Sequence, residues 1–456
     1  MKKLIIFLSL LLPLTLAAKR YYISPAGSDA AAGTLAAPFY TLNQAWTVVS
    51  AGDTIYLRGG TYSYTTQQVL TGKNGTAGNL IKVWAYSGET PIIRKGSPYT
   101  YDDSYGYGCY FSGNYVHLRG IEICYFTQET EHVWHGLRAY GDHNIFERLN
   151  IHHNGAGMIL GGTSTDNLIL NCDFHHNIDL LSPIPYNNSA GLSTSRNSNT
   201  SSITTVRGCR AYWNGDTGFD AFYNEGFVTW DSCWSFYNGY IPDSFTATNP
   251  DDMGEGAGWK FGETENSHTG EYKRLITHCV AYHNKAAGFF INDAVLVSHL
   301  YNNTSYDNGW INFCLNVNEA HVVRNNIAYH PGTYNCSVGT NASRVIDHNT
   351  FISIGVENTS YSVSDADFIS VDPSGIDGDR QSNGSLPVLS FLKLASGSDL
   401  IDAGANVGLS YSGTEPDIGS WEYGYAPVIP APAVTTKKIL KHSGKVIQHN
   451  GKFIVR

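Results

Sequence analysis

Six short segments of the chain end alike, in alternating apolar and polar residues followed by an asparagine. They are LNIHHN (149–154), CDFHHN (172–177), CRAYWN (209–214), CWSFYN (233–238), CVAYHN (279–284) and TSYDN (304–308). Successive asparagines are 23, 37, 24, 46 and 24 residues apart, so the repeat is about 23 residues long with insertions. Alternation with a period of two is typical of β-strands. Because one such unit cannot bury its apolar face alone, the pattern predicts a solenoid of stacked units.

Among solenoids, the repeat excludes two familiar classes. A leucine-rich repeat would show Leu-x-x-Leu-x-Leu, which these segments lack, and a propeller blade would need about 40 residues. A parallel β-helix is the architecture that remains, so the chain is predicted to be all-β. Equivalent residues of successive coils then stack about 4.8 Å apart.

Two columns of the repeat have structural explanations. Cys172, Cys209, Cys233 and Cys279 each precede a repeat asparagine by five residues, and alternation directs them inward. We expect a ladder of small core thiols, with disulfides between adjacent coils as the alternative. The asparagines are expected to hydrogen-bond one another at a corner of the coil and to tolerate left-handed backbone there, without a catalytic role.

The two ends of the chain differ from the repeat. Residues 1–18 have the charged, apolar and small-residue regions of a secretory signal peptide, so we expect a secreted, periplasmic or cell-surface protein without a later membrane span. The β-helix is expected over residues 19–424, and residues 41–62 predict an amphipathic cap helix followed by a first strand. Residues 425–456 predict a proline-rich linker and a basic C-terminal β-hairpin or tail, with a turn at Asn450-Gly451.

Charge and composition narrow the class of partner. The net charge is −10, and no dense stripe of Lys and Arg precedes the C-terminus, which argues against nucleic acid. The many tyrosines (30) and tryptophans (9), with abundant Asn and Gly, suit an extracellular β-rich protein that handles sugars. We expect it to be a monomer.

A further column follows each asparagine, as a glycine, a large apolar residue and then a variable residue. It appears in HGLRA, AGMIL, AGLST, TGFDA, AGWKF, AGFFI and NGWIN, whose variable positions are Arg138, Ile159, Ser193, Asp220, Lys260, Phe290 and Ile311. Alternation places the large apolar residue inside and the variable residue outside, on one exposed ridge. Asp220 and Lys260 would lie one coil apart, unless the 40 residues from Gly218 to Gly258 hide an extra coil.

Candidate catalytic chemistry gathers on this ridge. Asp216 and Asp220 are four residues apart and would point to one face of a strand, where they could bind calcium or only keep the surface soluble. Lys260 lies between Trp259 and Phe261, which are expected to point inward, and faces the same side as Asp220. To act as a general base it needs a pKa well below its usual value, which a bound dication or a nearby arginine would provide. Such a site could perform β-elimination next to a uronate carboxylate.

Other polar residues are candidate contacts for a substrate. They are Arg138, Arg196, Asp252, His268 and Lys285. The two arginines could anchor acidic sugars, and Lys285 is the reserve candidate for the base. The insertion before Lys260 also carries Asp251 and Glu255, which with Asp252 could line the same groove or only solvate a loop.

Two histidine pairs, His152-His153 and His175-His176, occupy equivalent places in successive repeats. A zinc cluster is imaginable there. Alternation, however, sends the two members of each pair to opposite faces, which favours stacked polar residues at a corner.

These motifs resemble the family nine polysaccharide lyases over about residues 20–423. The resemblance is carried by NLILNCDFHHN, GCRAYWNGDTGFD, GAGWKFGETENSHT, CVAYHNKAAGF, LKLASGSDLIDAG and EPDIGSWEYG. It implies a right-handed parallel β-helix that degrades pectin, an acidic plant cell-wall polysaccharide, by calcium-dependent β-elimination with a lysine base. Lys260 in GAGWKFG then falls on the catalytic lysine, and Asp216 and Asp220 in GDTGFD fall on two calcium ligands.

The sequence departs from that family's pattern at two positions. Thr217 stands where its motif has a second aspartate, and Ala190 in NSAGL stands where it has a further one. The calcium site could then be weaker, rebuilt from Asn188, Thr217 or backbone carbonyls, or moved toward Asp251 and Asp252. A reduced charge requirement favours a rhamnogalacturonan I backbone, which offers fewer carboxylates, over polygalacturonate.

Two further classes of function remain open. One is a glycoside hydrolase on the same fold, with Asp220 and either Asp216 or Asp252 as its acid and base. The other is a β-helix that binds glycans without catalysis. The lyase is the class that gives Lys260 a role.

Overall fold

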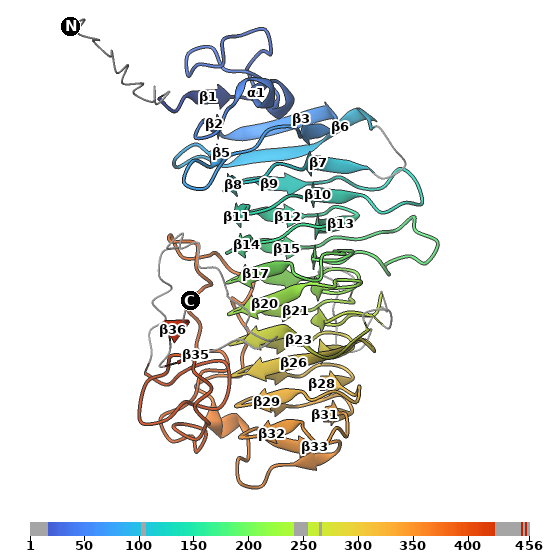
Figure 1. Cartoon of the computed structure of the whole chain (residues 1–456), viewed down its shortest axis with the longest axis vertical. Helices are drawn as coiled ribbons and strands as arrows, with labels where there is room; N and C mark the ends of the chain where they lie inside the picture. The colour runs from blue at the N-terminus through green and yellow to red at the C-terminus, as the bar shows by residue number, and fades with distance from the viewer. Residues whose placement is uncertain are drawn as a thin grey trace, which may run out of the picture.

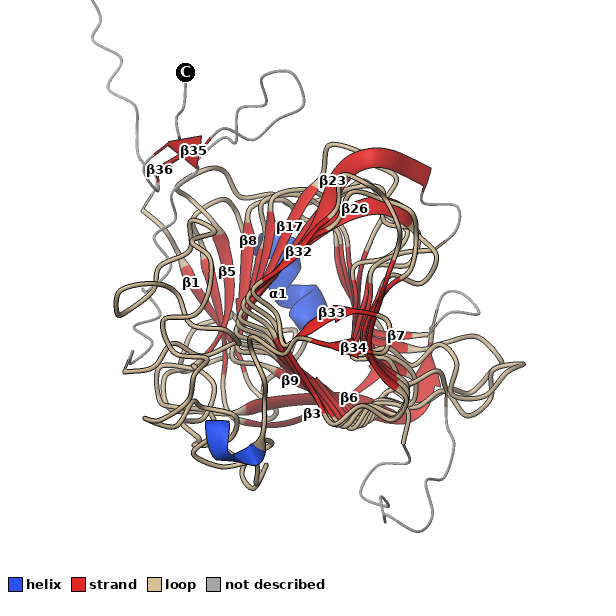
Figure 2. Cartoon of the chain, turned by 90° about the horizontal axis from the view of Figure 1, so that it is seen from below, coloured by secondary structure: helices blue, strands red, loops and turns tan. Residues whose placement is uncertain are grey.

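The computed structural model describes residues 17–101, 106–240, 254–263, 267–424, 448–449 and 452–453. Regular structure in this part is almost entirely β-strand, in three long sheets that wind around one core (Figures 1 and 2). Its helical elements are α1 (Leu42–Val48) and the 3-10 helix η1 (Asp365–Asp367). No helix among the described residues is long and apolar enough to cross a membrane. Residues 1–16 of the predicted signal peptide lie outside the described residues.

The first sheet holds β1 (Arg20–Ile23), β2 (Thr54–Leu57), β5 (Ile81–Ala85), β8 (Val116–Arg119), β11 (Ile145–Glu147), β14 (Asn167–Leu170), β17 (Ile203–Arg207), β20 (Phe227–Asp231), β23 (Ser267–Thr277), β26 (Val295–Tyr301), β29 (Val322–Arg324) and β32 (Val345–Asp347). The second sheet holds β3 (Gly60–Thr66), β6 (Pro91–Thr100), β9 (Glu122–Cys124), β12 (Asn150–His152), β15 (Asp173–His175), β18 (Arg210–Tyr212), β21 (Trp234–Phe236), β24 (Val280–Tyr282), β27 (Thr304–Tyr306) and β30 (Ile327–Tyr329).

The third sheet holds β4 (Gln68–Leu70), β7 (Tyr107–Phe111), β10 (His135–Ala139), β13 (Ala156–Leu160), β16 (Leu192–Ser193), β19 (Phe219–Asp220), β22 (Trp259–Lys260), β25 (Ala287–Phe290), β28 (Ile311–Leu315) and β31 (Tyr334–Val338). From β2 onward the chain visits the three sheets in turn, and each strand pairs in parallel with the strand of the next coil, as β11 does with β14. The predicted parallel β-helix is therefore confirmed. The asparagine-ended segments supply strands of the second sheet.

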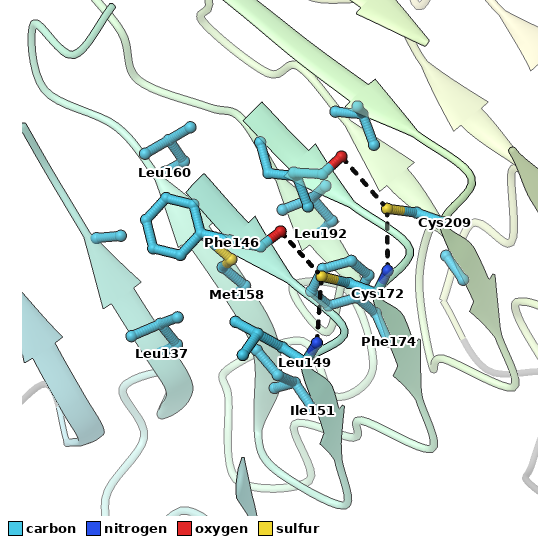
Figure 3. Packing of buried hydrophobic residues seen from close by; sticks show 14 of the residues in the cluster. Leu137, Phe146, Leu149, Ile151, Met158, Leu160, Cys172, Phe174, Leu192 and Cys209 are labelled. Atoms are coloured by element: carbon cyan, nitrogen blue, oxygen red, sulfur yellow. Dashed lines mark hydrogen bonds between the residues drawn. The ribbon is translucent and has the colours of Figure 1, made fainter. Parts of the chain in front are cut away.

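The predicted ladder of core thiols is present (Figure 3). Leu149 N and Cys172 Sγ are 3.4 Å apart, and Cys172 N and Cys209 Sγ are also 3.4 Å apart, so each thiol accepts a backbone N–H from the coil before it. Cys233 and Cys279 are joined in the same way at 3.4 Å. All eight cysteines of the chain are buried and free, so disulfides between coils are excluded. Small thiols pack in this buried column and also accept hydrogen bonds from backbone donors.

The asparagine ladder is also present, with one correction. Each side-chain amide donates to the side-chain oxygen of the next asparagine along the helix axis, at 2.8–3.1 Å, through Asn154, Asn177, Asn214, Asn238, Asn284 and Asn308. We expected left-handed backbone at the asparagine, but it occurs at the residue before it. His153, Trp213 and Tyr237 have φ of 53°, 52° and 56°. The asparagine is thus left free to bond along the stack.

The histidine pairs stack at the corner, as predicted, but the left-handed position contradicts the expectation that the two members of a pair point to opposite faces. His153 and His176 have φ of 53° and 54°, which interrupts strand alternation and turns both rings of each pair to one side. The Nδ1 atoms of His152 and His153 are 2.7 Å apart, and those of His175 and His176 are also 2.7 Å apart. The rings of His152 and His175 stack at 4.7 Å between centroids. The two members of a pair therefore share one face of the corner.

Helix α1 covers the N-terminal end of the core, as predicted (Figure 2). Thr41 caps it by accepting a hydrogen bond from Gln44 N at 3.0 Å, and Leu42 and Trp46 are buried against the first coil. The strand after it, β2, is not the first strand, because β1 precedes the helix and pairs with β2. The four residues of β1 are too few to show a clear alternation.

After the last coil, β33 (Phe351–Ser353) pairs antiparallel with β34 (Val356–Glu357). The chain then returns along the outside of the second sheet (Figure 1), where Phe391 packs on Tyr282 and Tyr306. In the predicted C-terminal tail, β35 (Gln448–His449) pairs antiparallel with β36 (Lys452–Phe453), while the proline-rich linker and Asn450-Gly451 lie outside the described residues.

Candidate functional site

The predicted column of variable residues runs along the third sheet. Register pairs Arg138 with Ile159, Ile159 with Ser193, Ser193 with Asp220, Asp220 with Lys260 and Lys260 with Phe290. Asp220 and Lys260 are therefore direct neighbours on adjacent coils, and no extra coil separates them.

The prediction that Ile311 is the last member of that column is wrong. Phe290 pairs with Cys314, and Ile311 pairs with Ala287 instead. The glycine of NGWIN, Gly309, lies in the turn before β28. Asn312 stands in the strand where the other coils have glycine, so counting from the wrong glycine shifted the register by three residues.

Lys260 points to the outer face of the coil but is not exposed. Trp259 and Phe261 on either side are fully buried in the core, as predicted. The lysine is only 7 % exposed, so the predicted exposed ridge is wrong at this position. The segment before β22 folds over it, because Gly254 N donates to Gly215 O at 2.8 Å and Glu255 N donates to Asp216 Oδ1 at 3.2 Å.

Three carboxylates surround the ammonium of Lys260. Its Nζ lies 2.5 Å from Glu255 Oε2 and 3.4 Å from Asp216 Oδ1. Asp220 on the adjacent strand is close enough to act on its charge. Asp216 precedes β19 rather than lying on it, so the same-strand prediction for the two aspartates is wrong in its geometry, although both act on Lys260.

Hydrogen-bond donors hold the two aspartates in place. Asp216 Oδ1 accepts from Thr217 Oγ1 at 3.2 Å. Asp220 Oδ1 accepts from Phe222 N at 2.9 Å, and its Oδ2 accepts from Ser195 Oγ at 3.4 Å. Thr217, which replaces an expected carboxylate, thus orients the remaining one.

The charge balance of this group shifts the pKa of its members. Burial raises the pKa of Asp216, and it raises that of Asp220 to about 6, while Lys260 opposes both shifts. Burial would lower the pKa of Lys260, but the carboxylates of Asp216, Asp220 and Glu255 outweigh it and raise that pKa. This direction is opposite to the one expected for a base. In the protein alone, Lys260 is an ammonium ion that neutralises its neighbours.

A calcium ion suits the donor set at this place. Asp216, Asp220 and Glu255 offer three carboxylates against one ammonium, so the group carries excess negative charge, with Asp216 buried, Asp220 partly buried and Glu255 half-exposed. Hard oxygen ligands of this kind prefer calcium. Among the described residues, however, no three donor atoms of His, Cys, Asp or Glu converge here. Solvent and substrate oxygens would have to complete the coordination shell.

Arg274 is a charged neighbour that sequence reasoning missed. Its guanidinium is fully buried, and it donates to Phe261 O at 2.7 Å, to Gly226 O at 2.7 Å and to Asn224 O at 2.8 Å. Burial lowers its pKa to about 9, and the charges of Glu225 and, to a smaller extent, Asp220 act against this shift. Arg274 lies two residues before Ile276 on β23, so both point inward. The sequence signal was a cation at an inward-facing position of KRLIT (273–277).

Arg138 lies on the same column, from β10, and is half-buried among aromatic rings. Its Nε donates to Tyr140 Oη at 2.6 Å, and its guanidinium lies over the rings of Tyr107 and Tyr140 at 4.8 and 5.2 Å. Cation–π contacts of this kind fix a guanidinium in place. The strand order β10, β13, β16, β19, β22 separates it from Lys260, so it could only touch a ligand that extends along the helix axis.

Of the other predicted substrate contacts, Lys285 lies beside the site, whereas the described contacts of Arg196 and His268 are with other residues. Lys285 Nζ donates to Gly254 O at 2.9 Å, next to Glu255, so it lies beside the site. Arg196 lies over the rings of Phe222 and Tyr223, each at 5.9 Å. His268 forms a short hydrogen bond with Glu225, and none of its described contacts reaches Lys260. Asp251 and Asp252 lie outside the described residues.

Comparisons with known proteins agree with this fold. Residues 21–341 match the family model described as "Pel9A-like, right handed beta helix region". Pectate lyase L of Dickeya chrysanthemi is 30% identical over 415 residues, which cover 88% of this chain and 90% of that protein. Pectate lyase PEL9 of Emericella nidulans is 30% identical over 415 residues, which cover 86% of this chain and 95% of that protein.

Two solved structures are similar over nearly their whole length. The crystal structure of pectate lyase Pel9A superposes with a TM-score of 0.72 at 29% identity and covers 89% of this chain and 96% of its own. A rhamnogalacturonan lyase superposes with a TM-score of 0.71 at 26% identity and covers 83% of this chain and 97% of its own. The helix is thus right-handed, as the resemblance implied.

Proposed function

The chain belongs to the Pel9A-like right-handed β-helix family, and from this premise we propose that it is a secreted polysaccharide lyase that cleaves a uronate-containing pectic backbone by β-elimination. The observation that carries the proposal is the buried ammonium of Lys260, held among Asp216, Asp220 and Glu255 on the outer face of the third sheet. The names of the relatives, which are pectate and rhamnogalacturonan lyases, support the substrate class. The signal-peptide pattern of residues 1–18 supports secretion.

In this proposal Lys260 is the general base. Neutral Nζ removes the proton from C5 of a uronate, the C4–O bond breaks, and a C4–C5 double bond forms, with the departing oxygen protonated by solvent. Nζ must first lose its own proton and leave Glu255. Glu255 has a half-exposed side chain, so it can turn into solvent when a substrate enters. The hydrogen bond to Asp216 Oδ1 at 3.4 Å then holds Nζ in position, beside Asp220 on the adjacent strand.

Calcium is the cofactor that we propose for this site, with Asp216 and Asp220 as its protein ligands. When bound, calcium would neutralise the uronate carboxylate and offset the charge of the two aspartates, which favours loss of a proton from C5.

The substrate that we propose is the rhamnogalacturonan I backbone. Thr217 is fully buried and donates its hydroxyl proton to Asp216. Ala190 is buried and has no side-chain oxygen to bind a metal. The site therefore has fewer carboxylates than the family motif. Fewer carboxylates hold less cation charge, which suits a backbone with a uronate at every second residue. Polygalacturonate is the second candidate, and the pectate lyase relatives favour it.

A substrate panel tests the proposal. Polygalacturonate, rhamnogalacturonan I and alginate are incubated with the protein, and ultraviolet absorbance and product masses are followed. A lyase on rhamnogalacturonan gives unsaturated uronate ends that absorb in the ultraviolet, with no added water. Products that gain one water at each cut and do not absorb would establish the glycoside hydrolase, and binding without products would establish the glycan-binding protein.

A further inference from the structure

A second cluster of chemically active side chains lies on the second sheet, away from Lys260. Glu122 and Cys124 are two residues apart on β9 and share a face, while Ile123 between them points into the core. The register of β12 on β9 sets His152 opposite Cys124. The donor atoms of Glu122, Cys124 and His152 all lie within 4.8 Å of one another, and no other three His, Cys, Asp or Glu side chains in the described part of the chain converge in this way.

The separations between these donor atoms are close to those around a tetrahedral metal ion. His152 Nε2 is 3.2 Å from Glu122 Oε1, and Cys124 Sγ is 3.8 Å from the same oxygen. Zinc binds such atoms at about 2.0–2.3 Å, which places neighbouring ligands roughly 3.3–3.7 Å apart. Small side-chain rotations would therefore bring all three atoms to one ion. A set of one nitrogen, one sulfur and one carboxylate oxygen suits zinc better than calcium.

The ring of His152 already has the support that a metal ligand needs. Without metal, its Nε2 donates to Glu122 Oε1 at 3.2 Å. Metal binding selects the other tautomer, in which Nδ1, 2.7 Å from His153 Nδ1, carries the proton and Nε2 offers its lone pair. The ring of His175 stacks on it at 4.7 Å and limits its rotation. Outer partners of this kind fix the tautomer and the orientation of a ligating imidazole.

The next coil repeats the hydrogen bond but lacks the ligands. His175 Nε2 is 2.9 Å from Asn150 Oδ1, and register places Asn150 beside Glu122 and His152 beside Cys124. A histidine–oxygen contact between coils therefore needs no metal. The pair of strands β9 and β12 differs from the pair β12 and β15, because it adds a carboxylate and a thiol to the imidazole. Burial, with Glu122 adding to it, raises the pKa of Cys124 to about 12, so the metal-free residue is a thiol.

We propose that Glu122, Cys124 and His152 form a binding site for a zinc-like divalent ion, with water as the fourth ligand. On binding, the Cys124 thiol releases its proton to solvent and a sulfur–metal bond forms, with no change in oxidation state. The site joins neighbouring coils of the second sheet, so its role is structural and independent of the proposed lyase activity.

Metal titration of the purified, chelator-stripped protein tests the proposal. We expect zinc to bind with one equivalent at this site, and cobalt to give the near-ultraviolet absorption of a thiolate–cobalt bond. Cys124→Ser should abolish that absorption, and Glu122→Gln and His152→Gln should weaken zinc binding about tenfold or more. Cys314→Ser is the matched control, because burial raises the pKa of Cys314 to about 12 as well, but Cys314 belongs to no such cluster of described residues.

The same measurements can overturn the proposal. Cobalt binding without the thiolate absorption removes Cys124 as a ligand. If Cys124→Ser fails to fold by circular dichroism, His152→Gln decides the matter, and an affinity for zinc equal to that of the unchanged protein contradicts the site. Lyase turnover should remain unchanged in His152→Gln, so failure of this proposal is distinguishable from failure of the proposed function.

Discussion

Two buried charge clusters on different sheets show how differently this β-helix can treat a carboxylate. On the second sheet, Asp173 accepts two hydrogen bonds each from Arg210 and Arg380, all at 2.7–3.0 Å. On the third sheet, one ammonium, that of Lys260, faces three carboxylates. Asp173 is over-compensated, whereas the carboxylates around Lys260 are under-compensated.

The pKa shifts follow that difference. Burial would raise the pKa of Asp173, but the guanidiniums of Arg380 and Arg210 outweigh it and hold that pKa well below its usual range. Asp216 and Asp220, with one ammonium between them, keep raised pKa values. Uncompensated buried charge of this kind is typical of functional sites, because a ligand can complete it. The Asp173 cluster leaves no such requirement, so it is structural.

Removal of the ammonium should give the largest effect on activity. Lys260→Ala deletes the proposed base, and we expect turnover to fall by about 10²–10⁴-fold, the usual contribution of a general base. Ultraviolet absorbance of the products measures it, and thermal unfolding should show a folded protein.

Lys285→Ala is the matched control for that variant. Lys285 donates to Gly254 O beside the site, and among the described residues it has no hydrogen bond or ion pair with Asp216 or Asp220, so we expect most of the activity to remain. An active Lys260→Ala with an inactive Lys285→Ala would transfer the role of base to Lys285.

Removal of the over-compensated carboxylate should give the largest effect on stability. Asp173→Ala leaves two guanidiniums without a counter-charge, and we expect a loss of about 3–5 kcal/mol in the free energy of unfolding. Arg210 also donates to Ile376 O and Gly378 O, so the C-terminal segment should loosen first. Denaturant unfolding measures the loss. Arg207→Ala is the control: its side chain is 45% exposed and pairs with Asp231, so we expect a loss below about 1 kcal/mol.

The repeating parts of both clusters could be predicted from the sequence. The thiol and asparagine ladders follow from one period, because equivalent residues of a solenoid stack whatever loops separate them. The same period placed Asp220 beside Lys260 across 40 residues. It failed at Ile311, where Asn312 replaces the expected glycine, and at His153, whose left-handed backbone interrupts the alternation.

Contacts between segments without a period could not be predicted. Arg380 reaches Asp173 across 207 residues, and no repeat relates the two positions. Glu255 comes from an insertion that the sequence left open as a groove lining or a solvated loop. Its position over Lys260 supports the groove, and it buries a lysine that alternation places outside. Its raised pKa follows from that cover. The sequence predicted which residues share the third sheet, and the structure adds which of them the loops bring into contact.

Chelation should affect the cluster around Lys260 but not the cluster around Asp173, and by less than mutation does. If Asp216 and Asp220 hold calcium, thorough treatment with EDTA should lower turnover by roughly tenfold or more, and added calcium should restore it. In chelated samples resupplied with zinc, unfolding of the region around Asp173 should not change, because its charge is already balanced. Full activity after chelation, with no response to calcium, would remove the two aspartates as required ligands.

The smallest expected effect is a difference in sign between two pH profiles, measured in the presence of chelator. The folded pKa of Asp173 lies below the unfolded value of about 3.9, so its stabilisation is complete above that value and is lost as pH falls through the folded pKa. The folded pKa of Asp220 is raised to about 6, so its contribution is most favourable below about 3.9 and is lost as pH rises through 6. Asp173→Asn should therefore lower the free energy of unfolding less in acid than at neutral pH. The free energy of unfolding of Asp220→Asn should rise relative to that of the unchanged protein between pH 4 and 7, by about 1–2 kcal/mol for a partly exposed carboxylate. Two profiles of the same sign would mean that the charge around Lys260 is compensated in solution by a group other than its described neighbours, and the contrast between the two clusters would then fail.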